Sequence, residues 1–140
     1  MKTYTAILFL TIAAMFSSQC DLPVEPDQQF NLGDTLLVDY KESLHNFEND
    51  ISVKFDSLLS DSRCPIDVVC FWAGNAEVKI DFETVGEENY LFLNTHYDFG
   101  KDTVISGFRV SLLDVYPYKL SDSTYAIEDH QIKLVINKTE

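Results

Sequence analysis

The segment at residues 61–74, "DSRCPIDVVCFWAG", gathers residue types that catalytic and binding sites use. It contains two of the chain's three cysteines, Cys64 and Cys70, its only tryptophan, Trp72, and Arg63. Paired cysteines can form a disulfide, ligate a metal or act as a redox couple, whereas arginine and tryptophan are frequent anchors of binding surfaces. The segment is therefore either a functional site or a disulfide-linked junction between two structural elements.

The surroundings of the two cysteines favour a structural disulfide. Metal sites built on cysteine usually use C-x-x-C spacing with further cysteine or histidine ligands nearby, but the three histidines of this chain all lie in other segments. Cys20 directly follows the N-terminal apolar segment. If Cys20 is modified and takes no part in a disulfide, Cys64 and Cys70 can bond to each other in an oxidising compartment and no free thiol remains. We therefore predict a Cys64–Cys70 disulfide and no metal site.

No arrangement of residues indicates an enzyme or a cofactor site. Serines are numerous, but none lies in G-x-S-x-G, and the "DFG" at residues 98–100 lacks the glycine-rich loop that a kinase needs. Acidic pairs such as Glu128 and Asp129 could bind Ca²⁺, but no EF-hand loop is present, and among 23 acidic residues such pairs are expected by chance as solvated loop charges. We predict a non-enzymatic protein without cofactors.

Charge and composition narrow the class of partner. The chain has 23 acidic and 10 basic residues, a formal net charge of −13, so the phosphate backbone of a nucleic acid would be repelled. Its 140 residues, 46% of them hydrophobic, are enough for one packed core. We expect a monomeric domain with an acidic surface and no affinity for nucleic acids.

Residues 1–19, "MKTYTAILFLTIAAMFSSQ", have the layout of a signal peptide, because Lys2 precedes an apolar run that ends in small polar residues. The run is shorter than the roughly 20 residues that a membrane-spanning helix needs. Since Cys20 follows directly, the segment resembles a bacterial lipoprotein signal peptide, with Gln19 where that family usually has a small residue. The resemblance implies that Cys20 becomes the acylated N-terminus. The alternative is ordinary secretion with Cys20 as an odd thiol.

The segment after Cys20 is typical of a tether. Residues 20–32 contain two prolines and several acidic residues, and residues 33–140 then form the predicted folded domain. This organisation predicts a protein anchored through lipid to a bacterial membrane. The outer membrane of a Gram-negative envelope is favoured, with the domain in the periplasm or at the cell surface.

Alternation of apolar and polar residues predicts strands throughout the domain. The expected strands are residues 35–40, 50–59, 75–85, 90–95, 102–118 with a break at Gly107, and 130–137. Residues 36–47 also fit one turn of helix. Short strands with turns every 8 to 12 residues favour an all-β fold, an antiparallel two-sheet β-sandwich of the immunoglobulin-like kind, with a small β-barrel as the alternative.

Aromatic residues near the predicted strand ends are candidates for a binding rim. The rim would combine Arg63 and Trp72 with Tyr97, Tyr116 and Tyr118. Tyrosines on a loop can stack on sugars or anchor a protein partner. For these tyrosines we favour a core position at a corner of the sandwich, hydrogen-bonded to the backbone.

The motif at residues 61–74 resembles a known family when it is taken with "AEVKI" at 76–80 and "GFRVSLLDVYPY" at 107–118. The family consists of small bacterial secreted proteins and lipoproteins that share DSRCP, C-x-W-A-G and L-x-D-x-x-P-Y segments. It has no established activity, so the resemblance implies an exported protein and gives no mechanism.

Within this motif we expect a junction between two strands. Trp72 would cover the disulfide, Gly74 would free the backbone for the next strand, and Arg63 would pair with Asp61 or Asp67. In the alternative interpretation, Arg63 and Trp72 face a ligand.

The expected function is that of a membrane-anchored lipoprotein that binds a protein or glycan or supports the envelope structurally. A protease inhibitor is the alternative, since small β-sandwiches can present loops to a peptidase. Its inhibitory loops would be the disulfide-linked turn and residues 94–102, "NTHYDFGKD".

Overall fold

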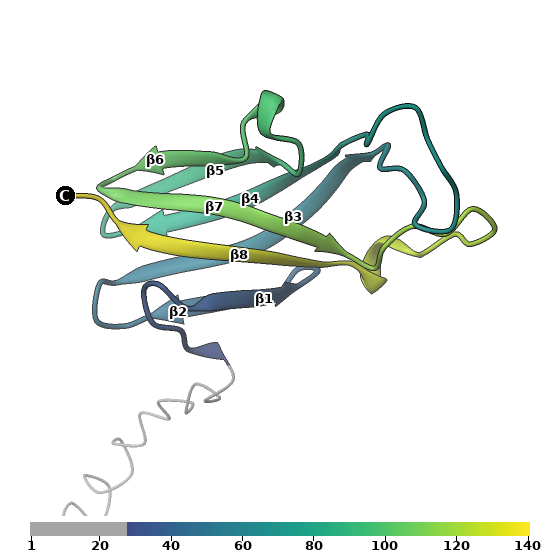
Figure 1. Ribbon diagram of the computed structural model, residues 1–140. Coiled ribbons are helices and arrows are strands. Elements are labelled where there is room, and N and C mark those ends of the chain that lie inside the picture. Colours follow the sequence, from purple (N-terminus) through teal and green to yellow (C-terminus); the bar gives the residue numbers. More distant parts are fainter. Residues whose placement is uncertain (1–27) are drawn as a thin grey trace, which may run out of the picture.

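The computed structural model describes residues 28–140. The predicted signal peptide, Cys20 and most of the predicted tether lie outside the described residues. The strands are β1 (Thr35–Asp39), β2 (Ser43–Asn46), β3 (Ile51–Asp61), β4 (Ala76–Thr84), β5 (Glu87–Asn94), β6 (Asp102–Ile105), β7 (Phe108–Tyr116) and β8 (Gln131–Lys138), with short 3-10 helices η2 (Tyr97–Phe99) and η3 (Ile127–Asp129) (Figure 1). No helix among residues 28–140 is long and apolar enough to cross a membrane.

The strands form two antiparallel sheets, which confirms the predicted β-sandwich. One sheet has the order β2-β3-β4-β5 and the other has the order β1-β8-β7-β6. Read around the sandwich, the strands follow one another in chain order and β8 returns to pair with β1. This up-and-down order differs from the interleaved Greek-key order of immunoglobulin domains. The two sheets do not close into a barrel.

The hydrophobic core lies between the two sheets and follows from the period of two residues in each strand. On β3, Ile51, Val53 and Phe55 are buried and alternate with half-exposed residues. Ile132 and Leu134 do the same on β8 in the facing sheet. Two tight turns match the predicted breaks, since Gly86 joins β4 to β5 and the positive-φ residues Ser106 and Gly107 join β6 to β7.

One segment differs from its sequence-based expectation. Residues 43–46, which also fitted a helical turn, form strand β2 at an edge of the sheet. Leu44 and Asn46 are buried while His45 is half-exposed, so the period of two holds although the segment is short and polar. The pairing of Leu44 with Val53 on β3 supplies the stabilisation that the local sequence lacks.

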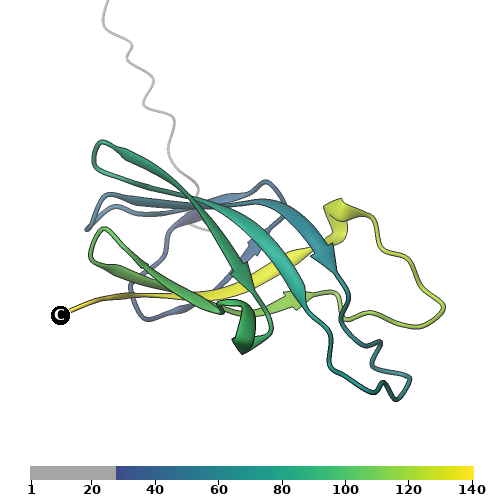
Figure 2. The same ribbon diagram turned by 90° about the horizontal axis from the view of Figure 1, so that it is seen from above.

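The sandwich has two distinct ends. The amide of Gly33 donates to Ile136 O at 2.8 Å, so the chain enters the domain near the C-terminal end of β8. The connection from β3 to β4 lies at the opposite end. There it projects beside the loop at residues 117–126 (Figures 1 and 2). The motif at residues 61–74 is therefore far from the end where the tether would attach.

Candidate functional site

The motif forms what we call the stapled loop, residues 61–75, between β3 and β4. Its base comprises residues 61–64 and 73–75, and its apex comprises residues 65–72. The base continues the β3–β4 ladder, because Ser62 N donates to Asn75 O at 2.7 Å and Cys64 N donates to Ala73 O at 2.8 Å. The two arms of the loop thus run side by side up to the disulfide.

Gly74 is the residue that allows the two arms to approach so closely. Its φ is +73°, and a Cβ at this position would lie 1.9 Å from Ser62 O and 2.8 Å from Arg63 Cα. Any side chain would therefore collide with the backbone of the opposite arm. This close approach is the physical reason for glycine at the last position of the motif.

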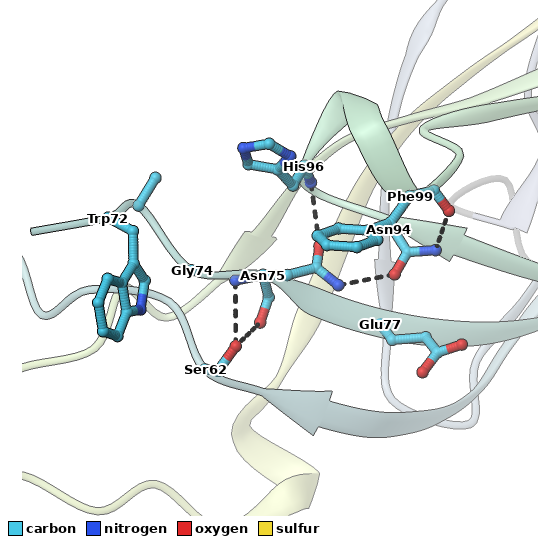
Figure 3. A pocket seen from close by; sticks show the side chains of 9 residues that line it. Ser62, Trp72, Gly74, Asn75, Glu77, Asn94, His96 and Phe99 are labelled. Carbon is cyan, nitrogen blue, oxygen red and sulfur yellow. Dashed lines mark hydrogen bonds between the residues drawn. The ribbon is translucent and has the colours of Figure 1, made fainter.

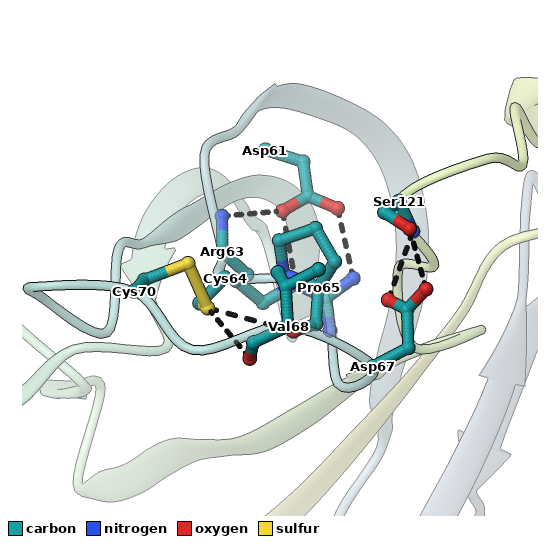
Figure 4. Close-up of a disulfide and its surroundings, with 8 residues drawn as sticks. All are labelled: Asp61, Arg63, Cys64, Pro65, Asp67, Val68, Cys70 and Ser121. Atoms are coloured by element: carbon teal, nitrogen blue, oxygen red, sulfur yellow. Dashed lines mark hydrogen bonds and ion pairs between the residues drawn. A yellow bond between two sulfur atoms is a disulfide. The ribbon is translucent and has the colours of Figure 1, made fainter.

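The disulfide between Cys64 and Cys70 is present, as predicted, with a Cα–Cα distance of 5.9 Å (Figure 4). It links the base of the loop to its apex. Because the linked segment is short, its effect on the free energy of unfolding is about 2 kcal/mol. Its main consequence is that the apex has few conformations available.

Arg63 ties the base to the other sheet. Its side chain is only 10% exposed, and its Nε and Nη2 donate to the Asp61 carboxylate at 2.9 and 2.8 Å. Its Nη1 donates to Val115 O at the end of β7, and its Nη2 also donates to Pro117 O at 3.1 Å. All of these partners lie within the domain. The structure therefore places Arg63 inside the domain and not on the predicted rim.

The charge of Asp61 is maintained by this pairing. Burial of the carboxyl group raises its pKa, but the hydrogen bonds and positive charge of Arg63 lower it by more, so that the net pKa lies below the usual value. Lys119 Nζ donates to the main-chain Asp61 O at 2.9 Å. Of the two partners expected for Arg63, the structure selects Asp61.

Asp67 has a different partner, in the loop at residues 117–126. Its carboxylate accepts hydrogen bonds from the hydroxyl of Ser121 and, at 2.9 Å, from its amide, and the hydroxyl bond lowers the pKa of Asp67 (Figure 4). Ile66 N also donates to Lys119 O at 3.0 Å. The stapled loop is thus held by its disulfide, by Arg63 and by a second loop.

The apex carries large apolar side chains that point into solvent. Val69 is 101% exposed, Phe71 is 98% exposed and Trp72 is 73% exposed, and Ile66 and Val68 are also exposed. The expectation that Trp72 covers the disulfide is wrong, because a ring buried against the sulfur atoms would not be this exposed. The nearest aromatic neighbour of Trp72 is the exposed Phe71, at 6.0 Å between ring centroids.

The predicted rim tyrosines have three different environments. Tyr97 on η2 is 77% exposed and stacks on His96 at 4.7 Å. Tyr116 is half-buried and packs edge-on against Tyr118 at 5.1 Å. Tyr118 donates its hydroxyl to Asp114, which raises the pKa of Tyr118 well above its usual value. Tyr97 is thus the most exposed of the three, and Tyr118 is 42% exposed.

Sequence reasoning missed the most exposed residues of the site. Val69 and Phe71 were not singled out, because apolar residues are normally assigned to a core. The available signal was their position on either side of Cys70, in a segment where no alternation marks a strand. Glu77 was missed as well, although it lines a cavity beside Trp72.

Among residues 28–140, no group of three or more histidine, cysteine, aspartate or glutamate side chains could hold a metal ion.

Comparisons of the chain with family models, with curated proteins and with solved structures give no match.

Proposed function

We propose that this protein is a lipid-anchored, extracytoplasmic binding module of a bacterial cell envelope that docks a protein partner on the apex of its stapled loop. Cys20 would carry the lipid and residues 20–32 would form the tether. The end of the sandwich where the chain enters would face the membrane, and the stapled loop would project away from it. The resemblance to secreted proteins and lipoproteins supports this location.

The observation that carries the proposal is the exposure of Val69, Phe71 and Trp72 on a cross-linked loop. Burial of each such side chain against a partner would contribute about 1.5–3 kcal/mol. Because the disulfide and Arg63 already hold the loop in place, little conformational entropy is lost on binding. Several exposed large apolar side chains gathered on one loop are typical of an interaction site.

The polar residues of the motif support a non-enzymatic role. Arg63 and Asp61 use their charged groups on each other and on the backbone, and Asp67 is bonded to Ser121. The cysteines are joined to each other and offer no nucleophile. The residue types that resembled a catalytic site are therefore occupied in supporting the apex.

The proposal is tested by site-specific crosslinking in the native envelope. A photo-crosslinking amino acid at position 71 in the apex is compared with the same group at position 37 on β1, which is also an exposed apolar site. We expect a defined protein adduct from position 71 only, and its loss when Trp72→Ser is added to the same chain. Equal adducts from both positions, or none from position 71, would contradict docking at the apex.

Lipid attachment needs a separate measurement. Mass spectrometry of the mature N-terminus is expected to find an acylated Cys20. An N-terminus without Cys20, or with an unmodified Cys20, would end the lipoprotein part of the proposal and leave docking at the apex to be decided by crosslinking.

Inhibition of a peptidase is a second candidate, favoured by one observation. The two loops that could enter a peptidase cleft, the stapled loop and residues 94–102, lie at the same end of the sandwich and share a cavity wall (Figure 3). Rigid exposed loops are a common way to block an enzyme, although this is an analogy between folds. Stoichiometric inhibition of any peptidase in a panel, lost in Phe71→Ser, would support it, and a panel without inhibition would exclude it.

A further inference from the structure

A cavity of about 660 Å³ opens beside the apex (Figure 3). Trp72 lines it from the stapled loop, His96 and Phe99 line it from the segment that joins β5 to β6, and Glu77 lines it from β4. The cavity is continuous with the apex through Trp72. A partner that docks on the apex would therefore lie over its opening.

Most polar groups in the cavity wall are already bonded to one another. Asn75 Nδ2 donates to Asn94 Oδ1 at 2.7 Å, and Asn94 Nδ2 donates to Phe99 O at 2.7 Å. Asn75 Oδ1 accepts from His96 N at 3.0 Å, and Ser62 Oγ donates to Asn75 O at 3.0 Å. These bonds fix the shape of the wall and leave its amides little capacity to bind a ligand.

Glu77 differs from these bonded groups. In the part of the chain that the structure describes, its half-buried carboxylate has neither a hydrogen bond nor an ion pair. Lys79 lies two residues along the same face of β4 but is not the counter-ion of Glu77. The Nζ of Lys79 instead lies 3.1 Å from Asp56 and 3.6 Å from Asp81. A negative charge without a counter-ion therefore lines the cavity.

Two large aromatic side chains also line the cavity. Trp72 and Phe99 are 73% and 64% exposed, so a large part of each side chain is accessible to a ligand. Aromatic rings attract a cation through the ring quadrupole and a carboxylate attracts it through its full charge, so a cavity that contains both favours a cationic ligand. A sugar would also stack on such rings, but it needs several free hydrogen-bonding groups, which the bonded amides do not supply. The net charge of −13 further favours a cationic ligand.

We infer that this cavity binds a cationic side chain, arginine or lysine, presented by the protein that docks on the apex. Glu77 is the counter-ion, and Trp72 and Phe99 are the aromatic walls. The inference rests on the proposed function, because the cation belongs to the docked partner. Arginine fits better than lysine, since a guanidinium can pair with a carboxylate through two hydrogen bonds while it stacks on an aromatic ring.

The fluorescence of Trp72 tests this inference, because it is the only tryptophan in the chain and it lines the cavity. The full lipidated protein in detergent micelles is titrated with the capped tripeptide acetyl-Ala-Arg-Ala-amide. The lysine peptide, the neutral citrulline peptide and chitobiose are titrated in parallel. We expect saturable changes with the two cationic peptides only, with a dissociation constant on the order of 1 mM for a lone side chain and weaker binding at higher salt.

Matched carboxylate variants identify the counter-ion. Glu77→Gln is expected to weaken binding of the arginine peptide by about tenfold or more. Glu83→Gln, which removes the same charge from an exposed site on the same strand, is expected to leave binding unchanged. Equal binding of the citrulline peptide, preferential binding of chitobiose, equal effects of the two variants, or no saturable change would each overturn the inference. Crosslinking from position 71 can still succeed in any of these cases, so the two proposals fail separately.

Discussion

The base and the apex of the stapled loop are adjacent in sequence and have opposite environments. In the base, the side chains of Arg63 and Asp61 are 10% and 11% exposed and are bonded to each other and, from Arg63, to the facing sheet. In the apex, Val69 and Phe71 are almost fully exposed. Charged residues are thus enclosed and apolar residues are exposed, the reverse of the usual distribution.

This contrast separates support from recognition within one motif. The residues that resemble a catalytic site hold the loop, and the residues that resemble a core are free to bind. If this division is correct, substitutions in the base should lower the free energy of unfolding, and substitutions in the apex should remove binding while leaving stability intact.

The largest effect is expected for Gly74→Ala. Its Cβ would lie 1.9 Å from Ser62 O, so the two arms of the loop would have to separate, and we expect a loss of about 4 kcal/mol. Gly86→Ala is the matched control, because its φ is also positive, at +77°, but nothing lies within 4 Å of the added Cβ. It should cost only about 1 kcal/mol in urea unfolding. Similar losses for both would show that the arms do not need to approach closely.

Arg63→Met is expected to cost about 3 kcal/mol, because it leaves the Asp61 carboxylate enclosed without its counter-ion. Adding Asp61→Asn should recover part of this loss, and a double-mutant cycle measures the coupling. Arg63→Lys should not substitute, since an ammonium cannot reach Asp61 and two carbonyls in the fork geometry of a guanidinium. If the losses caused by the two single substitutions simply add, Arg63 and Asp61 do not stabilise the fold as a pair.

Cys64→Ala/Cys70→Ala should lower stability by about 2 kcal/mol, while export and acylation of Cys20 stay unchanged. The apex also loses its restraint, so crosslinking from position 71 should weaken. Thermal unfolding with and without a reducing agent measures the same difference in the wild type. A transition that does not move on reduction would contradict the role of the disulfide.

Acidification should weaken the base through Asp61. Because its pKa is below the usual value in the folded state, its contribution is complete above the unfolded value of about 4 and is lost as the pH falls through the folded pKa. We expect the Asp61→Asn variant to lose less stability than the wild type over that range. Asp56, whose pKa is lowered to about 2 by Lys41, titrates in both proteins and cancels in the comparison. Parallel pH profiles would refute the contribution of Asp61.

The sandwich and the disulfide were predictable from the sequence because they depend on local signals. Alternation marked seven of the strands, and the count of cysteines identified the pair. The short strand β2 was ambiguous because its stabilisation comes from pairing with β3. The four residues of β2, taken alone, carry no signal that they pair with β3.

The site was predictable only in part, because its contacts join distant segments. Arg63 could be expected to pair with a nearby aspartate, but its bonds to Val115 O and Pro117 O exist only because the two sheets pack together. The exposure of Phe71 cannot be recognised from residue type. Glu77 occupies an ordinary polar position of an alternating strand, and only the loops around it make it part of a cavity.

The most direct test of the division between base and apex combines two measurements on Phe71→Ser/Trp72→Ser. We expect its free energy of unfolding to stay within about 0.5 kcal/mol of the wild type, because both side chains are exposed. In the native envelope, the adduct from a crosslinker at position 69 should disappear in the same variant. A large loss of stability, or an adduct that persists in a folded variant, would contradict the assignment of recognition to the apex.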